Sequence, residues 1–255
     1  MNKPPAPITY SSVVARDSIR LGFMLAALHN VDILAADVGN AYLNASCREK
    51  VYCIAGPEFG SDEGKTAIII RALYGLKSSG AAWRAHLAQS MHDLDFVPSK
   101  GDPDVWMRPA TKPDGYKYYE YILIYVDDIL CLSHQADKIM DTIGKLYRLK
   151  TDPKTGKAYD KPDRYLGAKI EEYQFEDDLK SYWSISAGQY VLEAVKNVEA
   201  ELAKVGRKLN SRACGPLANS YKPELDVSSA LDPKRANYYQ KLIGGFEMGC
   251  RTRKD

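Results

Sequence analysis

Apolar residues recur with helical spacing in some segments of this chain and form continuous, strand-like stretches in others. Residues 13–29 predict a helix with one apolar face, formed by Leu21, Met24, Leu25 and Leu28. A buried strand is expected at 32–38, and shorter strands at 50–54 and 66–72. One of the serines at 78–79 is expected to cap a second helix, whose apolar face carries Trp83, Leu87, Met91 and Leu94.

The middle of the chain predicts two consecutive hairpins. Residues 105–108 and 116–125 flank a Lys-Pro-Asp-Gly turn, and the second of these strands continues into a hairpin that closes at 129–133. A helix is expected next, marked by the regular spacing of Ile139, Met140, Ile143, Leu146 and Tyr147. Antiparallel hairpins interspersed with helices predict an α+β fold.

The last third of the chain is expected to be simpler. A strand at 165–170 should pair with 179–186, and a helix should follow at 187–206 with an apolar seam of Val191, Val195, Val198, Leu202 and Val205. Residues after 211 are rich in Pro, Ser and Asn and predict a linker, which leads to a short amphipathic piece at 238–246.

Composition sets only broad bounds. An apolar content of 45% and a net charge of +2 are ordinary for a globular protein and do not alone indicate nucleic acid. Five cysteines without paired spacing favour free thiols in a reducing compartment, and no stretch is long and apolar enough for a membrane span. We therefore expect a soluble, intracellular protein.

The most informative segment is Tyr125-Val126-Asp127-Asp128, inside an apolar run from Tyr121 to Leu132. Its flanks are strand-like, and a turn can accept the two acids because Asp tolerates unusual backbone angles. Two adjacent carboxylates in apolar surroundings repel each other and are costly to desolvate, so a cation would stabilise them. The pattern predicts a divalent metal at the tip of a β-hairpin.

A second acid fits the same site. Asp37 ends the apolar stretch that begins at Val31, and a Gly-containing turn follows it. If the two strands lie side by side, Asp37 meets Asp127 and Asp128. Oxygen-only ligands suit Mg²⁺, with Mn²⁺ as an alternative, and paired ions support in-line phosphoryl displacement. The predicted chemistry is phosphoryl transfer.

Four motifs, in order along the chain, resemble the reverse transcriptases of copia-type long-terminal-repeat retrotransposons. The segment 37–44, Asp-Val-Gly-Asn-Ala-Tyr-Leu-Asn, is similar to the first catalytic strand of that family. Residues 72–83 resemble its template- and nucleotide-contacting turn, and Tyr125 to Asp128 match its catalytic hairpin. Residues 165–170 resemble its primer-grip hairpin.

The resemblance implies a right-hand polymerase fold. Residues 1–30 would be residual fingers with the first helix, and 31–165 the palm, with a fingers insertion at about 45–95. Residues 166–210 would form the primer-grip hairpin and the thumb helix. Residues 211–255 would be a linker and the start of a connection region. The family usually has a longer fingers segment and a ribonuclease H domain, so a chain shortened at both ends is expected.

The resemblance also implies roles for individual residues. Asp37 and Asp127 would be the principal metal ligands, with Asp128 assisting and the Val38 carbonyl completing one metal shell. Tyr42 would exclude a ribose 2′-hydroxyl by its bulk. Nucleotide or template contacts would come from Tyr74, Gly75 and Lys77, and the primer grip from Leu166, Gly167 and Ala168. Lys150 could protonate pyrophosphate, but neighbouring lysines compete for that role.

The expected partners are an RNA or DNA template with its primer, deoxynucleoside triphosphates, and further polyprotein regions or a partner chain. The leading hypothesis is RNA-directed DNA polymerase activity within a retrotransposon polyprotein. The main alternative is an inactive remnant that only binds nucleic acid. A two-metal phosphatase or nuclease is disfavoured, since no histidine cluster accompanies Asp37 and Asp127.

Overall fold

The computed structural model describes residues 9, 11–175, 181–210, 222, 225, 227 and 229–250. The chain divides into two compact units, which are considered separately. The first comprises Met1–Pro162 and Tyr173–Trp183, and the second comprises Asp163–Glu172 and Ser184–Asp255. Within the described residues, no helix is both long and apolar enough to cross a bilayer.

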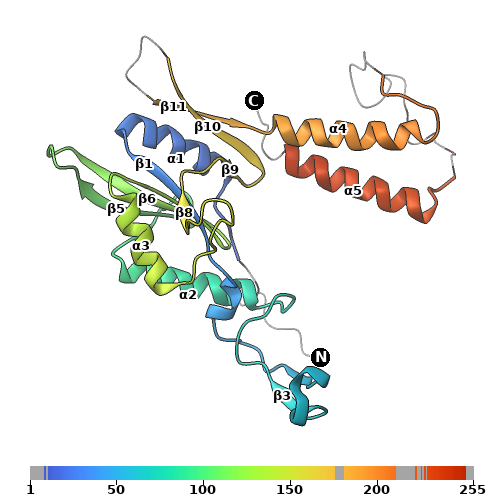
Figure 1. Cartoon of the computed structure of the whole chain (residues 1–255), viewed down its shortest axis with the longest axis horizontal. Helices are drawn as coiled ribbons and strands as arrows, with labels where there is room; N and C mark the ends of the chain where they lie inside the picture. The colour runs from blue at the N-terminus through green and yellow to red at the C-terminus, as the bar shows by residue number, and fades with distance from the viewer. Residues whose placement is uncertain are drawn as a thin grey trace. The chain divides into compact units, whose positions relative to one another are not determined.

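A six-stranded sheet forms the centre of the first unit (Figure 1). Its strand order is β4-β5-β6-β7-β1-β8, and the pairings are antiparallel. The strands are β4 (Val97–Pro98), β5 (Val105–Thr111), β6 (Lys117–Tyr125), β7 (Asp128–Ser133), β1 (Asp32–Asp37) and β8 (Tyr159–Asp160). The predicted hairpins and the predicted strand before Asp37 are thus confirmed, within an α+β architecture.

Helices cover both faces of this sheet. Helix α1 (Arg16–His29) contacts β1, β6 and β7 on one face. Helices α2 (Ser79–Asp93) and α3 (Ala136–Leu146) pack on the other face. There, Trp83, Leu87 and Met91 of α2 join Ile122 and Cys131 of the sheet in one buried core. Helix α2 therefore buries the apolar face that its sequence predicts.

The predicted buried face of α1 is wrong. Leu21, Met24 and Leu28 are 53%, 50% and 68% exposed, whereas the helix buries Ile19, Gly22, Phe23 and Ala26. The reason is close approach, since a Cβ added at Gly22 would lie 3.2 Å from a methyl carbon of Leu123. Small residues let the helix backbone sit against the sheet, and apolar periodicity alone does not reveal that preference.

Both predicted helix starts are also determined by distant residues. Helix α1 begins at Arg16 rather than 13, and Asp102 accepts hydrogen bonds from Ala15 N and Ser18 Oγ at 2.9 and 2.6 Å. The expected serine cap of α2 is absent, because the Ser78 hydroxyl donates to Glu49 and the Ser79 hydroxyl to the Leu73 carbonyl.

A small hairpin precedes α2. Strands β2 (Tyr52–Ile54) and β3 (Thr66–Ile68) pair with each other, and the 3₁₀ helix η3 (Pro57–Asp62) lies between them in sequence. The predicted strands are confirmed, although both are shorter than expected.

A three-stranded sheet has the order β11-β10-β9. The predicted single strand at 165–170 is wrong, because β9 (Arg164–Tyr165) ends there and β10 (Ala168–Gln174) begins. Leu166 and Gly167 have φ values of +48° and +81° and form a tight turn that pairs Ala168 with Tyr165. Strand β11 (Ser181–Ser186) confirms the predicted partner segment, whereas residues 176–180 lie outside the described part.

The second unit contains two helices that contact each other, α4 (Gly188–Ala203) and α5 (Pro233–Cys250). Helix α4 confirms the predicted helix but ends three residues early, so that Val205 lies beyond it and is exposed. Val195, Val198 and Leu202 of the predicted seam are half-buried. Residues 211–221 of the predicted linker are outside the described part. The linker was expected to reach 237, which is wrong, because α5 already begins at Pro233 and includes the predicted piece at 238–246.

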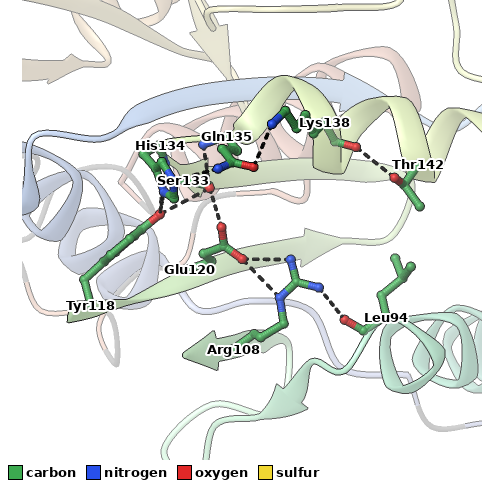
Figure 2. A network of polar contacts seen from close by, with 9 residues as sticks. All are labelled: Leu94, Arg108, Tyr118, Glu120, Ser133, His134, Gln135, Lys138 and Thr142. Atoms are coloured by element: carbon green, nitrogen blue, oxygen red, sulfur yellow. Dashed lines mark hydrogen bonds and ion pairs between the residues drawn. The ribbon is translucent and has the colours of Figure 1, made fainter. Parts of the chain in front are cut away.

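An ion pair between a partly exposed arginine and a buried glutamate fixes the sheet beneath α3 (Figure 2). Arg108 on β5 lies opposite Glu120 on β6, and its Nη2 is 2.8 Å from Glu120 Oε2. The other Glu120 oxygen accepts a 2.6 Å bond from the fully buried Ser133 hydroxyl, and Arg108 Nη1 donates to the Leu94 carbonyl. The network joins three strands to the end of α2.

Arg108→Met should therefore destabilise the protein strongly. The Glu120 side chain is only 6% exposed, so loss of Arg108 leaves a buried carboxylate without its cation. We expect the free energy of unfolding to fall by about 3–5 kcal/mol, measured by urea denaturation.

Lys65→Met is the matched control, because Lys65 forms an exposed pair with Asp62 at 2.6 Å. It should change stability by less than about 1 kcal/mol. Equal effects of the two substitutions would contradict the role given to the Arg108–Glu120 pair.

Candidate active site

The turn between β6 and β7 is strained at Val126. This β-branched residue has a φ of +59°, a conformation that valine rarely adopts. Two tertiary hydrogen bonds hold the turn, from Trp83 Nε1 to the Val126 carbonyl at 2.7 Å and from Val38 N to the Asp127 carbonyl at 2.8 Å. The unusual backbone angle was expected at the acids and is instead at Val126. Strain of this kind costs about 1–3 kcal/mol and often marks functional sites.

Strand pairing brings the predicted acids together. In the β1–β7 register Asp37 is the direct partner of Asp128, and Asp127 is the adjacent turn residue. Val38 is fully buried and forms a bridge with Leu149. Asp37 and the acids about ninety positions later thus lie at the same end of two paired strands, as the sequence predicted.

The positively charged side chain of Lys150 lies beside these acids. Its Nζ lies 2.7 Å from Asp37 Oδ2 and 3.6 Å from Asp127 Oδ2, and its backbone N donates to the Asp37 carbonyl at 2.8 Å. The hydrogen bond to Asp37 raises the pKa of Lys150, so its ammonium form is favoured. Sequence reasoning could not select this lysine among its neighbours, because no spacing signal links it to Asp37.

The carboxylates of the site are electrostatically unfavourable in the absence of a further cation. Burial raises the pKa of Asp128 to about 6, with added repulsion from Asp127 and Asp37, while Lys150 acts in the opposite direction. Asp37 Oδ1 is buried and accepts no hydrogen bond within the described structure. A buried oxygen without a partner is costly and is suited to receive a cation.

These residues fit a hard divalent ion by their chemistry. Asp37, Asp127 and Asp128 offer carboxylate oxygens, and the orphaned Asp37 Oδ1 gives the ion a reason to bind. Among the described residues, no three acidic, histidine or cysteine side chains already converge as a ready ligand group. The Lys150 ammonium contacts two of the three acids, which gives a physical reason why the three carboxylates do not converge on one point.

The residues expected to contact the nucleotide come from two segments. Tyr42 is on the 3₁₀ helix η2 (Ala41–Asn44), and its pKa is raised by burial and by the charges of Tyr74 and Asp127. Tyr74 stacks on Tyr42 with ring centroids 4.4 Å apart. Gly75 has a φ of +97° and open space around it, and Lys77 is exposed.

The predicted primer-grip residues belong to another part of the molecule. Leu166 and Gly167 form the tight turn described above, and Ala168 is the buried first residue of β10. All three are in the second unit, so their role stays a prediction.

Lys150→Met should have two opposite effects. Metal-free protein should lose stability by about 1 kcal/mol, since the repelling carboxylates lose their partly exposed cation. Affinity for Mn²⁺, measured by electron paramagnetic resonance, should rise by about tenfold, because no ammonium competes for the same oxygens.

Lys157→Met is the matched control, since Lys157 pairs with Asp160 at the same 2.7 Å on the exposed surface. It should leave Mn²⁺ affinity unchanged. A weaker affinity in Lys150→Met would show that Lys150 supports the ion rather than competing with it.

Asp128→Asn should stabilise metal-free protein in a pH-dependent way. The pKa of Asp128 in the fold, about 6, lies above its ordinary value of 3.8, so stability is lost as pH rises between these values. At pH 8 with chelator, the variant should gain about 1–2 kcal/mol in unfolding free energy, a figure lowered by solvent screening. At pH 4 the unfolding free energies of the two proteins should converge. A variant less stable than the parent at pH 8 would contradict this account.

Comparison with known proteins agrees with this geometry. Residues 7–197 match the family described as reverse transcriptase (RNA-dependent DNA polymerase). The chain is 25% identical over 249 residues to the Retrovirus-related Pol polyprotein from transposon RE1 of Arabidopsis thaliana, covering 97% of the chain and 15% of that polyprotein. It is 27% identical over 260 residues to the polyprotein from transposon TNT 1-94 of Nicotiana tabacum, covering 96% of the chain and 18% of the relative.

A third relative is the Transposon Ty1-NL2 Gag-Pol polyprotein of Saccharomyces cerevisiae, which is 25% identical over 238 residues, with 92% of the chain and 13% of the polyprotein covered. The chain thus spans less than a fifth of the length of these curated relatives. Because the family match extends over most of its residues, the chain belongs to the reverse transcriptase (RNA-dependent DNA polymerase) family.

Proposed function

We propose that this chain carries the polymerase site of a retrotransposon reverse transcriptase and transfers nucleotides onto a primer 3′-hydroxyl. The observation that carries the proposal is the β1–β7 register, which places Asp37 opposite Asp128 beside the strained Val126 turn. An orphaned buried carboxylate oxygen at this position supports the same proposal.

Asp37 and Asp127 would hold the metal ions, with Asp128 and the Val38 carbonyl assisting. A pair of Mg²⁺ ions, or Mn²⁺ in their place, would activate the primer hydroxyl and neutralise the triphosphate when bound. The protein itself orients these oxygens, since the Val38–Asp127 and Lys150–Asp37 backbone hydrogen bonds fix both strand ends.

Lys150 is the proposed proton donor to the departing pyrophosphate. Its raised pKa keeps a proton on Nζ at neutral pH, and Asp37 and Asp127 hold this atom at the site. From this position the Lys150 ammonium would donate its proton to a phosphate oxygen of the bound triphosphate. Tyr42, near Asp127, would stand under the incoming sugar.

The subdomains follow from the same proposal. Residues 31–165 would be the palm, and the β2–β3 hairpin would be part of a fingers insertion at about 45–95. Residues 1–30 would supply residual fingers with α1. Residues 166–210 would form the primer grip and the thumb helix, with 211–255 leading to a connection region. Template, primer and deoxynucleoside triphosphates are the proposed partners, within a polyprotein of a cytoplasmic particle or the nucleus.

Primer extension on a poly-A template with Mg²⁺ tests the proposal. Asp127→Asn should lower extension by about 100- to 1,000-fold, because the metal ions would lose one of their charged ligands. Template binding, measured by fluorescence anisotropy, should be retained and should weaken steeply with salt.

Asp141→Asn is the control, since Asp141 is outside the site and accepts a hydrogen bond from Tyr159. It should retain extension. Template binding by the unmutated chain without any extension would instead identify a nucleic-acid-binding remnant.

A further inference from the structure

The ring of Tyr42 packs against one neighbouring aromatic ring and points its hydroxyl toward a glycine. One face stacks on Tyr74, with centroids 4.4 Å apart and ring planes inclined by 28°. Its hydroxyl end lies near α2, where a Cβ added at Gly80 would be 3.8 Å from the Tyr42 hydroxyl oxygen and 3.3 Å from Ser11 Cβ. Because Gly80 has no side chain, Tyr74 is the side chain that limits rotation of the Tyr42 ring.

The backbone beneath Tyr42 is equally constrained. Ala41 is fully buried, and Asn44 Nδ2 donates to the carbonyls of Asn40 and Ala41 at 3.3 and 3.1 Å. Asn40 itself has a φ of +51°, in the left-handed region that asparagine tolerates. Because the backbone is fixed, rotation of the Tyr42 side chain is the main way in which its ring could move.

Tyr74 approaches from a different segment that is itself anchored. Its loop is tied to the end of η2 by Arg71 Nη1, which donates to the Asn44 carbonyl. It is tied to the residues just after η2 by the Ser46–Arg71 bridge and by Ala72 N, which donates to the Ala45 carbonyl. Tyr74 is nevertheless 62% exposed. An exposed ring that stacks on Tyr42 instead of entering the core adds little to the fold, yet restricts its neighbour.

We propose that Tyr74 is a positioning residue that holds the Tyr42 ring in place and thereby sets the preference for deoxyribonucleotides over ribonucleotides. This inference rests on the proposed function. A side chain that discriminates by clash is effective only if it cannot rotate away from the extra hydroxyl. Stacking on Tyr74 opposes that rotation, so the selectivity depends on a residue that need not touch the sugar.

The test is the ratio of kcat/KM for deoxyribonucleotide and ribonucleotide incorporation opposite the same template base. Tyr74→Ala should lower this ratio by about 3- to 10-fold, the range that the stacking of one aromatic pair implies. Tyr74→Phe, which keeps the ring, should restore the ratio. Tyr119→Ala, which removes an exposed tyrosine far along β6, should leave it unchanged.

Two further variants separate positioning from direct contact. Tyr42→Ala should lower the ratio more than Tyr74→Ala does, and the double variant should be no more permissive than Tyr42→Ala alone. If Tyr74 instead only contacts the nucleotide, Tyr74→Ala would raise KM for both substrates and leave the ratio unchanged, which would overturn the inference. An additive double variant would also overturn it.

The failure of the inference and that of the proposed function are distinguishable. Nucleotide binding can be measured without turnover, in a complex of the unmutated chain with a primer–template whose primer ends in a dideoxynucleotide. Absence of nucleotide binding and of incorporation by that chain would overturn the proposed function, and this inference with it. Normal incorporation by the unmutated chain, with an unaltered ratio in Tyr74→Ala, would overturn the inference alone.

Discussion

Repulsion between carboxylates is the constraint around which the candidate site is built. The β1–β7 register places Asp37 directly against Asp128, with Asp127 beside them in the turn. Burial and mutual repulsion raise the pKa of Asp128 to about 6, and one oxygen of Asp37 is buried without a partner. In water such carboxylates would separate. Here the sheet holds them together, and Lys150 provides the cation that makes the arrangement tolerable.

Much of the surrounding structure restricts that edge of the sheet. Trp83, buried in α2, donates its indole N–H to the carbonyl of the strained Val126, so the core on one face fixes the turn directly. On the same sheet, the Arg108–Glu120–Ser133 network joins three strands and keeps their register. A slip of one residue would turn every side chain to the opposite face and would separate Asp37 from Asp128. The network fixes β7, and β7 is the strand against which β1 positions Asp37.

In the neighbouring loops, a half-buried side chain and an exposed one restrict each other. Tyr42 and Tyr74 come from η2 and from the loop before α2, and each segment is tied to the other by backbone hydrogen bonds. Stacked rings at the surface contribute little hydrophobic burial, and their value lies in geometry. For the proposed polymerase function, discrimination between deoxyribonucleotides and ribonucleotides has to come from the shape of the sugar, because the two can carry the same base.

The sequence by itself determined the elements and the identity of the acids. Continuous apolar stretches predicted β1, β6 and β7, and the acid pair within them indicated Asp127 and Asp128 before any strand pairing was known. Only the tertiary structure decided the buried face of α1 and the contacts of Asp102 and Glu49 at the helix starts. It also decided the turn at Leu166 and Gly167, and which lysine lies beside Asp37, namely Lys150. The first group depends on local periodicity and residue type. The second depends on contacts between residues far apart in sequence. Such contacts can override local secondary-structure preference, and no residue spacing in the chain reveals them.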